Sequence, residues 1–177
     1  GDFEEMSIQP EAALESQLIK KLSKKGYRKV NIKDSRELEN NFRIQLETHN
    51  KTPLTDSEFN KIMTHLAGGS TFEKAKRLRD KFELHRDSGI KYIEFINMKD
   101  WCRNLFQVTH QVNNYDGRYH NRYDVTILVN GLPLVQIELK RRGLEIKEAF
   151  NQVVRYKNES LQVGLFNYIQ LFIISNG

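Results

Sequence analysis

Two apolar runs joined by Asn130-Gly131 restrict the fold of this chain more than any other feature. An Asn-Gly pair between such runs indicates a β-hairpin with a tight turn, because both residues adopt positive φ readily. Side chains alternate between the two faces of a strand, so we expect Gln136, Glu138 and Lys140 to share one face of the second strand. A carboxylate and an ammonium group are therefore presented side by side from a rigid element.

Asp124 lies on the first strand, and its position relative to Glu138 depends on the register of the hairpin. A two-residue loop would place Asp124 opposite Ile137, on the wrong face. An odd-numbered loop, or a compensating β-bulge, would place it opposite Glu138. Pro133 cannot donate a ladder hydrogen bond, which favours a loop longer than two residues. We expect Asp124 to pair with Glu138 by one of these two routes.

These polar side chains suit the hydrolysis of a phosphodiester. That reaction needs a hard cation such as Mg2+, held by one or two carboxylates, to neutralise developing charge and to orient the attacking water. Asp124 and Glu138 would be the metal ligands. Lys140 would position or help deprotonate the water and stabilise the charged phosphorus centre. Taken without context, Asp followed by Glu-x-Lys is a short and common pattern, and an exposed hairpin face bearing a Glu and a Lys is the alternative.

The chain divides into a helix-rich half, residues 1–88, and a half rich in β-branched and aromatic residues, 89–177. Amphipathic spacing and capping boxes predict helices at 11–25, near 34–47, and after Thr55 and Ser70. Period-two patterns predict strands at 90–98, 105–112, 123–129, 134–141 and 168–175, with a helix at about 144–159. The sequence has no linker or repeat, so we expect one domain whose helices pack on the sheet.

Composition bounds the class of protein. At 177 residues the chain can bury a core of its own, and its one cysteine, Cys102, allows no internal disulfide. The sequence contains no Cys/His cluster with zinc-site spacing, no signal-peptide layout and no apolar run near the ~20 residues that span a bilayer. We therefore expect a soluble, cytoplasmic protein. The formal net charge of +5 favours approach to a polyanion without identifying one.

The segment 119–152 carries a family resemblance. Residues 122–143, the run Glu148-Ala149-Phe150-Asn151-Gln152 and Tyr156 resemble the R subunits (HsdR) of type I restriction enzymes. Weaker similarity extends over most of the chain, at 14–27, 101–112 and 172–177. The nuclease of these subunits belongs to the PD-(D/E)xK superfamily. The resemblance thus implies an α/β, restriction-endonuclease-like core with a central mixed β-sheet flanked by helices.

Individual residues take roles from this resemblance. It implies that Asp124 and Glu138 are metal ligands and that Lys140 is the catalytic lysine. The residue before Asp124 is Tyr123 instead of the Pro in the superfamily's name, which looks typical of these R subunits.

Three further positions are implied outside the hairpin. Gln152 and Tyr156 match the Gln-x-x-x-Tyr motif of the RecB-like subgroup, one helical turn apart, and would support DNA and the geometry of the active site. Without the resemblance, this pair could equally be a surface Gln and a half-buried Tyr. Glu15 would correspond to the carboxylate of the family's first helix.

The function implied is that of a type I site-specific deoxyribonuclease. It would cut double-stranded DNA with Mg2+, in a complex with modification (M) and specificity (S) subunits, after ATP-driven translocation by the same polypeptide. The sequence has no Gly-x-x-x-x-Gly-Lys-Ser/Thr phosphate loop and ends directly after a predicted strand. We therefore expect a fragment of a longer chain whose ATP motor follows Gly177. Two other functions remain open on sequence alone: a catalytically silent nuclease-like module that docks DNA or protein, and a free-standing PD-(D/E)xK repair nuclease.

Overall fold

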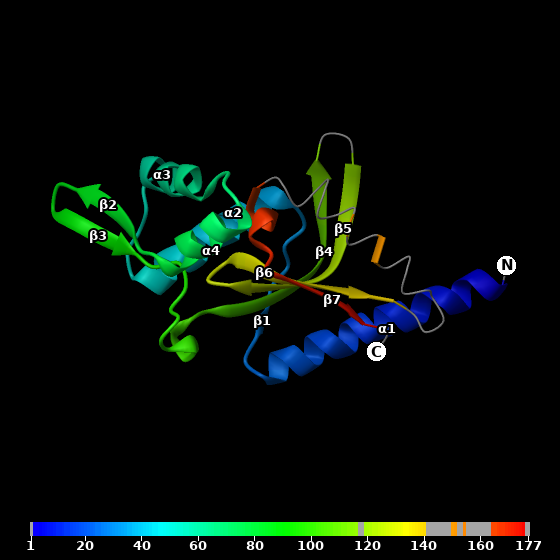
Figure 1. The fold of residues 1–177 in the computed structure, drawn as a ribbon. Coiled ribbons are helices and arrows are strands. Elements are labelled where there is room, and N and C mark those ends of the chain that lie inside the picture. The colour runs from blue at the N-terminus through cyan, green and yellow to red at the C-terminus, as the bar shows by residue number, and fades with distance from the viewer. Residues whose placement is uncertain (1, 117–118, 141–149, 152–153, 155–163, 176–177) are drawn as a thin grey trace.

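The structure is a computed structural model that describes every residue except 1, 117–118, 141–149, 152–153, 155–163 and 176–177. Within the described residues, a five-stranded sheet has the order β1-β4-β5-β6-β7. β4 (Phe106–Asp116), β5 (Tyr119–Val129) and β6 (Leu132–Leu139) pair antiparallel with one another. β1 (Arg28–Lys29) and β7 (Leu171–Ser175) join in parallel at the two edges. The sheet is therefore mixed, and the expected α/β class is confirmed (Figure 1).

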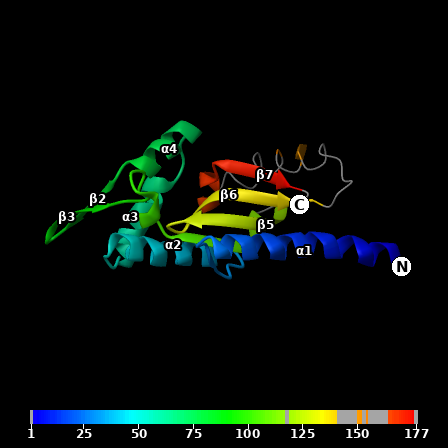
Figure 2. The same cartoon turned by 90° about the horizontal axis from the view of Figure 1, so that it is seen from below.

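Helices flank this sheet, and their bounds are α1 (Asp2–Lys24), α2 (Ser35–Asn50), α3 (Asp56–Leu66) and α4 (Thr71–Arg79). The predicted capping boxes are present: Thr55 and Ser70 each exchange two hydrogen bonds with the Glu three residues later. Figure 2 shows α1 running alongside the strands, while α2, α3 and α4 gather at the other end of the sheet. Judged on length and apolar character, none of the helices in the described ranges could cross a membrane.

A second, two-stranded sheet departs from the sequence prediction. β2 (Phe82–Arg86) pairs antiparallel with β3 (Gly89–Ile93), although β2 lies in the half expected to be helical. Its sequence, Phe-Glu-Leu-His-Arg, is short and partly charged, so its strand character depends on the pairing with β3. The strand predicted at 90–98 ends at Ile93, and the chain then leaves the sheet.

The C-terminal part also differs from its prediction. The strand expected from residue 168 begins only at Leu171, because Gly164–Tyr168 forms a 3-10 helix, η3. Another short 3-10 helix, η1 (Trp101–Arg103), precedes β4. The helix predicted at about 144–159 lies almost entirely outside the described residues.

Two apolar clusters hold the helices against the sheet. In the larger one, Phe42 of α2, Ile62 of α3 and Leu78 of α4 pack in one cluster with Tyr123 and Leu128 of β5. The smaller cluster joins α1 to β4, β5 and β6 through buried Ile19, Val108, Val125, Ile137 and Leu139. The sheet therefore buries apolar side chains against α1 on one side and against the α2–α4 group on the other.

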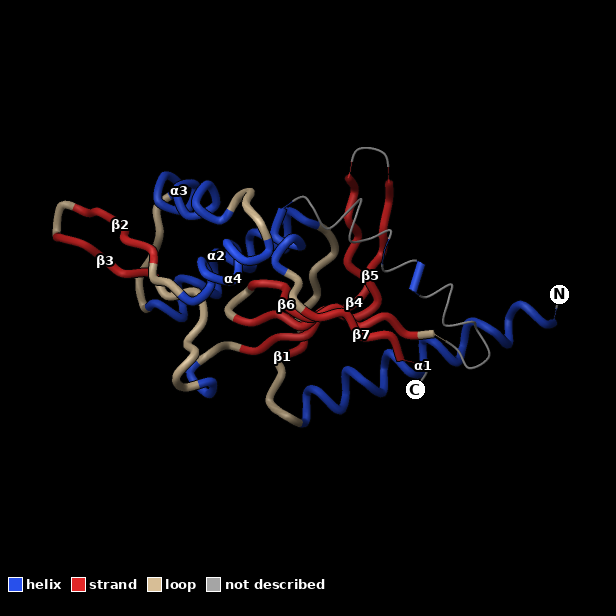
Figure 3. The backbone as a smooth tube through the Cα atoms, viewed as in Figure 1, coloured by secondary structure: helices blue, strands red, loops and turns tan. Residues whose placement is uncertain are grey.

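β4 and β5 bend sharply where Gln111 lies opposite Asp124 (Figures 1 and 3). Gln111 has a φ of 54°, in the left-handed region that a regular strand does not visit. Tyr123 packs in the larger cluster, whereas Val125 packs in the smaller one with α1. Alternate residues of a regular strand share a face. The two faces of β5 are therefore exchanged at the bend, and Asp124 sits at the point of exchange.

Candidate active site

The β5–β6 hairpin has a two-residue loop, 130–131, and the expectation of a longer loop was wrong. Pairing is regular through Pro133 and then skips Leu134, so that Ile127 pairs with Val135. Leu134 is the extra residue of a β-bulge, and its carbonyl accepts a hydrogen bond from the backbone N–H of Gln170, at 2.9 Å. The bulge shifts the register by one residue, which confirms the second of the two predicted routes.

The short loop is fixed by contacts outside the hairpin. Asn130 and Gly131 have φ values of 50° and 82°, as a tight turn requires. The buried Asn130 side chain accepts a hydrogen bond from the N–H of Leu105 and donates one to the carbonyl of Phe95, each at 2.8 Å. A Cβ on Gly131 would lie 2.6 Å from the Cα of Phe42, so the packing of α2 leaves room for glycine alone.

Beyond the bulge, Asp124 and Glu138 lie opposite each other, because Val125 pairs with Ile137 and the carboxylates occupy the next positions. Glu138 is only 2% exposed and is hydrogen-bonded to Asp124. Asp124 also accepts a hydrogen bond through Oδ2 from the N–H of Leu139, at 2.8 Å. Burial, then the charge of Asp124 and the hydrogen bond to it, raise the pKa of Glu138 from 4.5 to about 9. At neutral pH, Glu138 therefore keeps its proton in the metal-free protein.

A chain of buried hydrogen bonds fixes the position of the Glu138 side chain. Gln136 donates through Nε2 to Oε1 of Glu138 at 3.0 Å, and Thr126 donates through Oγ1 to Oε1 of Gln136 at 2.6 Å. Both supporting side chains are fully buried. The sequence prediction gave neither residue a role in the site. The sequence does contain a signal for Gln136, which precedes Glu138 by two residues and therefore lies on the same face of the strand. Thr126 is the residue that pairs with Gln136 across the hairpin.

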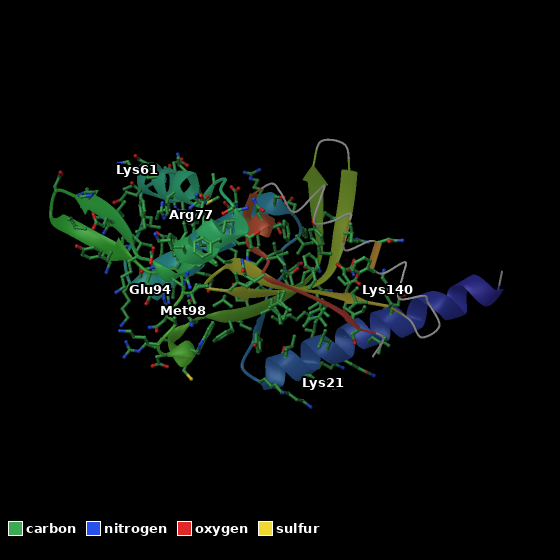
Figure 4. All side chains as sticks on the ribbon, viewed as in Figure 1. Lys21, Lys61, Arg77, Glu94, Met98 and Lys140 are labelled. Carbon is green, nitrogen blue, oxygen red and sulfur yellow. The ribbon has the colours of Figure 1, made fainter. Side chains whose placement is uncertain are left out.

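Lys140 follows the last residue of β6, as Figure 4 shows, and its backbone N–H donates to the carbonyl of Ser175 at 2.8 Å. Its side chain is partly buried, and its positive charge lowers the pKa of Glu138, although by less than burial raises it. The structure thus brings Asp124, Glu138 and Lys140 to one end of the hairpin.

Glu15 of α1 reaches the same region. Its Oε1 lies 2.6 Å from Nδ1 of His110, and its Oε2 accepts a hydrogen bond from Nε2 of Gln111 at 2.8 Å. Glu15, Gln111 and Asp124 line a pocket of about 170 Å3 together with Leu139. The bend in β4 and β5 therefore brings the helix-one carboxylate and the hairpin carboxylate to one pocket. His110 and Gln111 hold the Glu15 carboxylate at this pocket, and Gln111, which lies opposite Asp124 on β4, had no role in the sequence prediction.

The two remaining predicted site residues, Gln152 and Tyr156, lie outside the described residues. Their expected roles stay predictions.

Comparison with known proteins identifies the family. Residues 8–177 match the family model described as the type I restriction enzyme R protein N terminus. The chain belongs to this family. This R-protein N-terminal domain is 51% identical over 178 residues to the type I restriction enzyme SauCOLORF180P endonuclease subunit of Staphylococcus aureus strain COL, an alignment that covers 97% of the chain and 19% of that protein. It is 40% identical over 180 residues to the EcoprrI endonuclease subunit of Escherichia coli, covering 97% of the chain and 57% of that protein.

The chain therefore spans about a fifth of the length of its staphylococcal relative. A shorter similarity, 34% over 85 residues, extends to the putative MjaVIIIP endonuclease subunit of Methanocaldococcus jannaschii.

The carboxylate donors of this R-protein N-terminal domain fit a hard cation such as Mg2+ better than a metal that prefers sulfur or nitrogen ligands. Among the residues that the structure describes, no three His, Cys, Asp or Glu side chains form a cluster that could hold a metal ion alone. Asp124 and Glu138 instead offer two carboxylates, and Mg2+ keeps several of its waters and takes one or two such ligands. Burial and, next, the charge of Asp124 raise the pKa of Glu138, and a cation bound between the two carboxylates would neutralise that charge.

Proposed function

We propose that this chain is the nuclease domain of a type I restriction enzyme R subunit and that it hydrolyses phosphodiester bonds of double-stranded DNA. The observation that carries the proposal is the pairing of Asp124 with buried Glu138, with Lys140 directly after the end of that strand. Family membership supports the same conclusion, because the named relatives are endonuclease subunits of type I restriction enzymes. The arrangement of hairpin carboxylates and lysine in a mixed sheet also favours the PD-(D/E)xK superfamily.

Asp124 and Glu138 would hold a divalent cation, Mg2+ by the chemistry of the donors. When bound, the cation supplies charge neutralisation at the scissile phosphate and lowers the pKa of a coordinated water. The protein's contribution is to fix the two carboxylates. Gln136 anchors Glu138, and the N–H of Leu139 anchors Asp124, so neither ligand has to be reorganised when DNA arrives.

Lys140 would act on the water and on the phosphate. An ammonium group next to the carboxylate pair can orient the attacking water and stabilise the extra negative charge that develops on the phosphate oxygens. Glu15 would support the site from α1, by holding His110 and Gln111 at the edge of the pocket that Asp124 lines. Gln152 and Tyr156 would support the bound DNA, as the RecB-like motif implies.

The full-length subunit would cut within a larger assembly. We propose that modification and specificity subunits select the site, and that an ATP-driven motor outside these residues translocates DNA before cleavage. In that arrangement the Asp124–Glu138 site carries only the cutting chemistry, and it would show little sequence preference of its own.

The decisive experiment compares three forms of the full-length subunit in its assembled complex: wild type, Lys140→Ala and Lys61→Ala. Lys61 is an exposed lysine of α3, remote from Lys140 in Figure 4, and serves as the matched control. With Mg2+ and ATP, Lys140→Ala should lose DNA cleavage by 100-fold or more, a magnitude typical of losing one transition-state contact, while ATP hydrolysis continues. Lys61→Ala should match the wild type in both assays.

Cleavage by Lys140→Ala at the wild-type rate would overturn the assignment of Lys140. If the wild-type complex hydrolyses ATP but never cuts DNA under any divalent metal, the domain is instead a silent docking module. Equal melting temperatures for the three forms would exclude misfolding as the cause of lost cleavage, since removing a partly exposed lysine leaves no large cavity.

A further inference from the structure

A second, larger hollow continues from the candidate active site along α1. It has a volume of about 480 Å3 and lies between α1, β1 and β4. Ala12 and Glu15 line both this groove and the smaller pocket at Asp124, so the two hollows are neighbours. His110 also lines the groove, and its Nδ1 lies 2.6 Å from Oε1 of Glu15, the residue that lines both hollows.

The groove is basic along its length. Lys20 and Lys24 of α1 and Lys29 of β1 line it, and all three side chains are exposed. Within the described part of the chain, none of these lysines has a carboxylate partner within 4.0 Å among the ion pairs. Glu15 is the one acidic residue of the lining, and its two oxygens are already engaged by His110 and Gln111.

Hydroxyl groups lie between the lysines. Ser16 and Ser23 line the same face of α1, each one helical turn from a lysine of that face. Cations interleaved with small hydrogen-bond donors suit a chain of phosphates better than they suit a flat acidic protein surface, because phosphate oxygens accept from both groups.

We propose that this groove binds the sugar–phosphate backbone of the DNA strand that runs to or from the Asp124–Glu138 site. The proposal rests on the nuclease function proposed above, and it adds the contact surface next to the cut. Along the helix axis, Lys20 lies about 7.5 Å from Glu15 and Lys24 about 13.5 Å, at 1.5 Å per residue. Phosphates of one strand advance by about 3.4 Å each. With the axis of the duplex along α1, the two lysines would therefore meet phosphates roughly two and four nucleotides from the phosphate level with Glu15.

The test measures binding of the full-length subunit to a 40-base-pair duplex in EDTA, so that no cleavage occurs, over a series of salt concentrations. The groove variant is Lys20→Gln with Lys24→Gln. The control is Lys21→Gln with Lys25→Gln, which removes the same charge from the last turn of α1 and the residue directly after it, without touching the groove lining. Lys21 lies on the side of α1 that faces away from the sheet, as Figure 4 shows.

Each phosphate contact contributes about 0.9 to the slope of log K against log salt. The groove variant lacks two lysines, so its slope should be shallower by about 1.8. For equal binding at 1 M salt, the groove variant should then bind about 60-fold more weakly than the wild type at 0.1 M salt. The control should keep the wild-type slope. Basic residues elsewhere in the full-length subunit contribute equally to all three proteins and cancel in the comparison.

An unchanged slope in the groove variant, or an equal loss in both variants, would overturn the proposal. Because binding is measured without metal, this result is independent of whether the site cuts. Wild-type protein that fails to cleave with Mg2+, while the groove variant still loses slope, would refute the nuclease function and leave a DNA-binding groove. Normal cleavage by the wild type together with an unchanged slope would refute the groove alone.

Discussion

Replacing Glu138 by Gln should stabilise the metal-free protein at alkaline pH and remove much of its pH dependence. Burial and the charge of Asp124 raise the pKa of Glu138 from 4.5 to about 9. Between these two values the folded state keeps a proton that the unfolded chain has lost. The stability contributed by this carboxyl is therefore fully present below pH 4.5 and is lost as the pH rises towards 9. A Gln at this position is neutral at every pH and still accepts the hydrogen bond that Gln136 donates.

The expected effect is large enough to measure easily. Each pH unit between the two pKa values lowers the free energy of unfolding by about 1.4 kcal/mol. From about pH 5 to pH 8, the wild type should lose about 4 kcal/mol relative to Glu138→Gln. For a chain of this size, 1 kcal/mol shifts the melting temperature by about 2–4 °C, so the gap between the two proteins should widen by about 8–16 °C.

Thermal unfolding followed by circular dichroism in EDTA, at a series of pH values, tests this expectation. Glu39→Gln is the matched control, because Glu39 is an exposed carboxylate of α2 and its removal should leave the change in stability between pH 5 and pH 8 as in the wild type. A gap between Glu138→Gln and wild type that is the same at pH 5 and pH 8 would refute the reasoning. Adding Mg2+ at pH 8 should raise the melting temperature of the wild type more than that of the variant, since a bound cation takes over the role of the proton.

Three further perturbations test the framework of the site. Gly131→Ala should lower the free energy of unfolding in urea by about 2–4 kcal/mol, because its Cβ would meet the backbone of Phe42 at 2.6 Å; a loss below 1 kcal/mol would argue against this close approach. Asn130→Ala should cost about 2–3 kcal/mol in the same assay, because its buried side chain makes hydrogen bonds to three other residues. Tyr156→Phe in the full-length subunit should melt at the wild-type temperature but cut DNA more slowly, and an unchanged rate would remove the RecB-like motif from the proposed function.

Local signals in the sequence predicted the parts of the fold that depend on neighbouring residues. Thr55 and Ser70 cap their helices as the spacing of hydroxyl and Glu predicts, because a capping box needs only four consecutive residues. The hairpin at 130–131 follows from turn chemistry, and the shared face of Gln136 and Glu138 follows from the period of a strand. The pairing of Asp124 with Glu138 was also expected, but the local signals left open whether a longer loop or a bulge would produce it.

Features that depend on distant parts of the chain were not predicted. Pro133 suggested a longer loop, but α2 packs so closely on Gly131 that the turn stays short, and the extra residue appears later as a bulge at Leu134. The strand Phe82–Arg86 shows no clear period of its own and depends on its pairing with β3. The left-handed conformation of Gln111 has no marker in the sequence either, because glutamine is not a residue that favours positive φ.

The candidate site requires two irregularities together: the bulge, which was one of the two expected routes, and the bend, which was not predicted. Without the bulge at Leu134, Glu138 would face away from Asp124, since a shift of one residue reverses every side chain of a strand. Without the bend at Gln111, Asp124 would point away from α1, because α1 packs on the face that carries Val125. The bulge brings the carboxylates together, and the bend turns Asp124 towards the pocket that Glu15 lines. In this chain, the Asp and Glu-x-Lys pattern forms the candidate site because the hairpin carries both distortions, whereas the pattern alone is short, common in sequences and weakly specific.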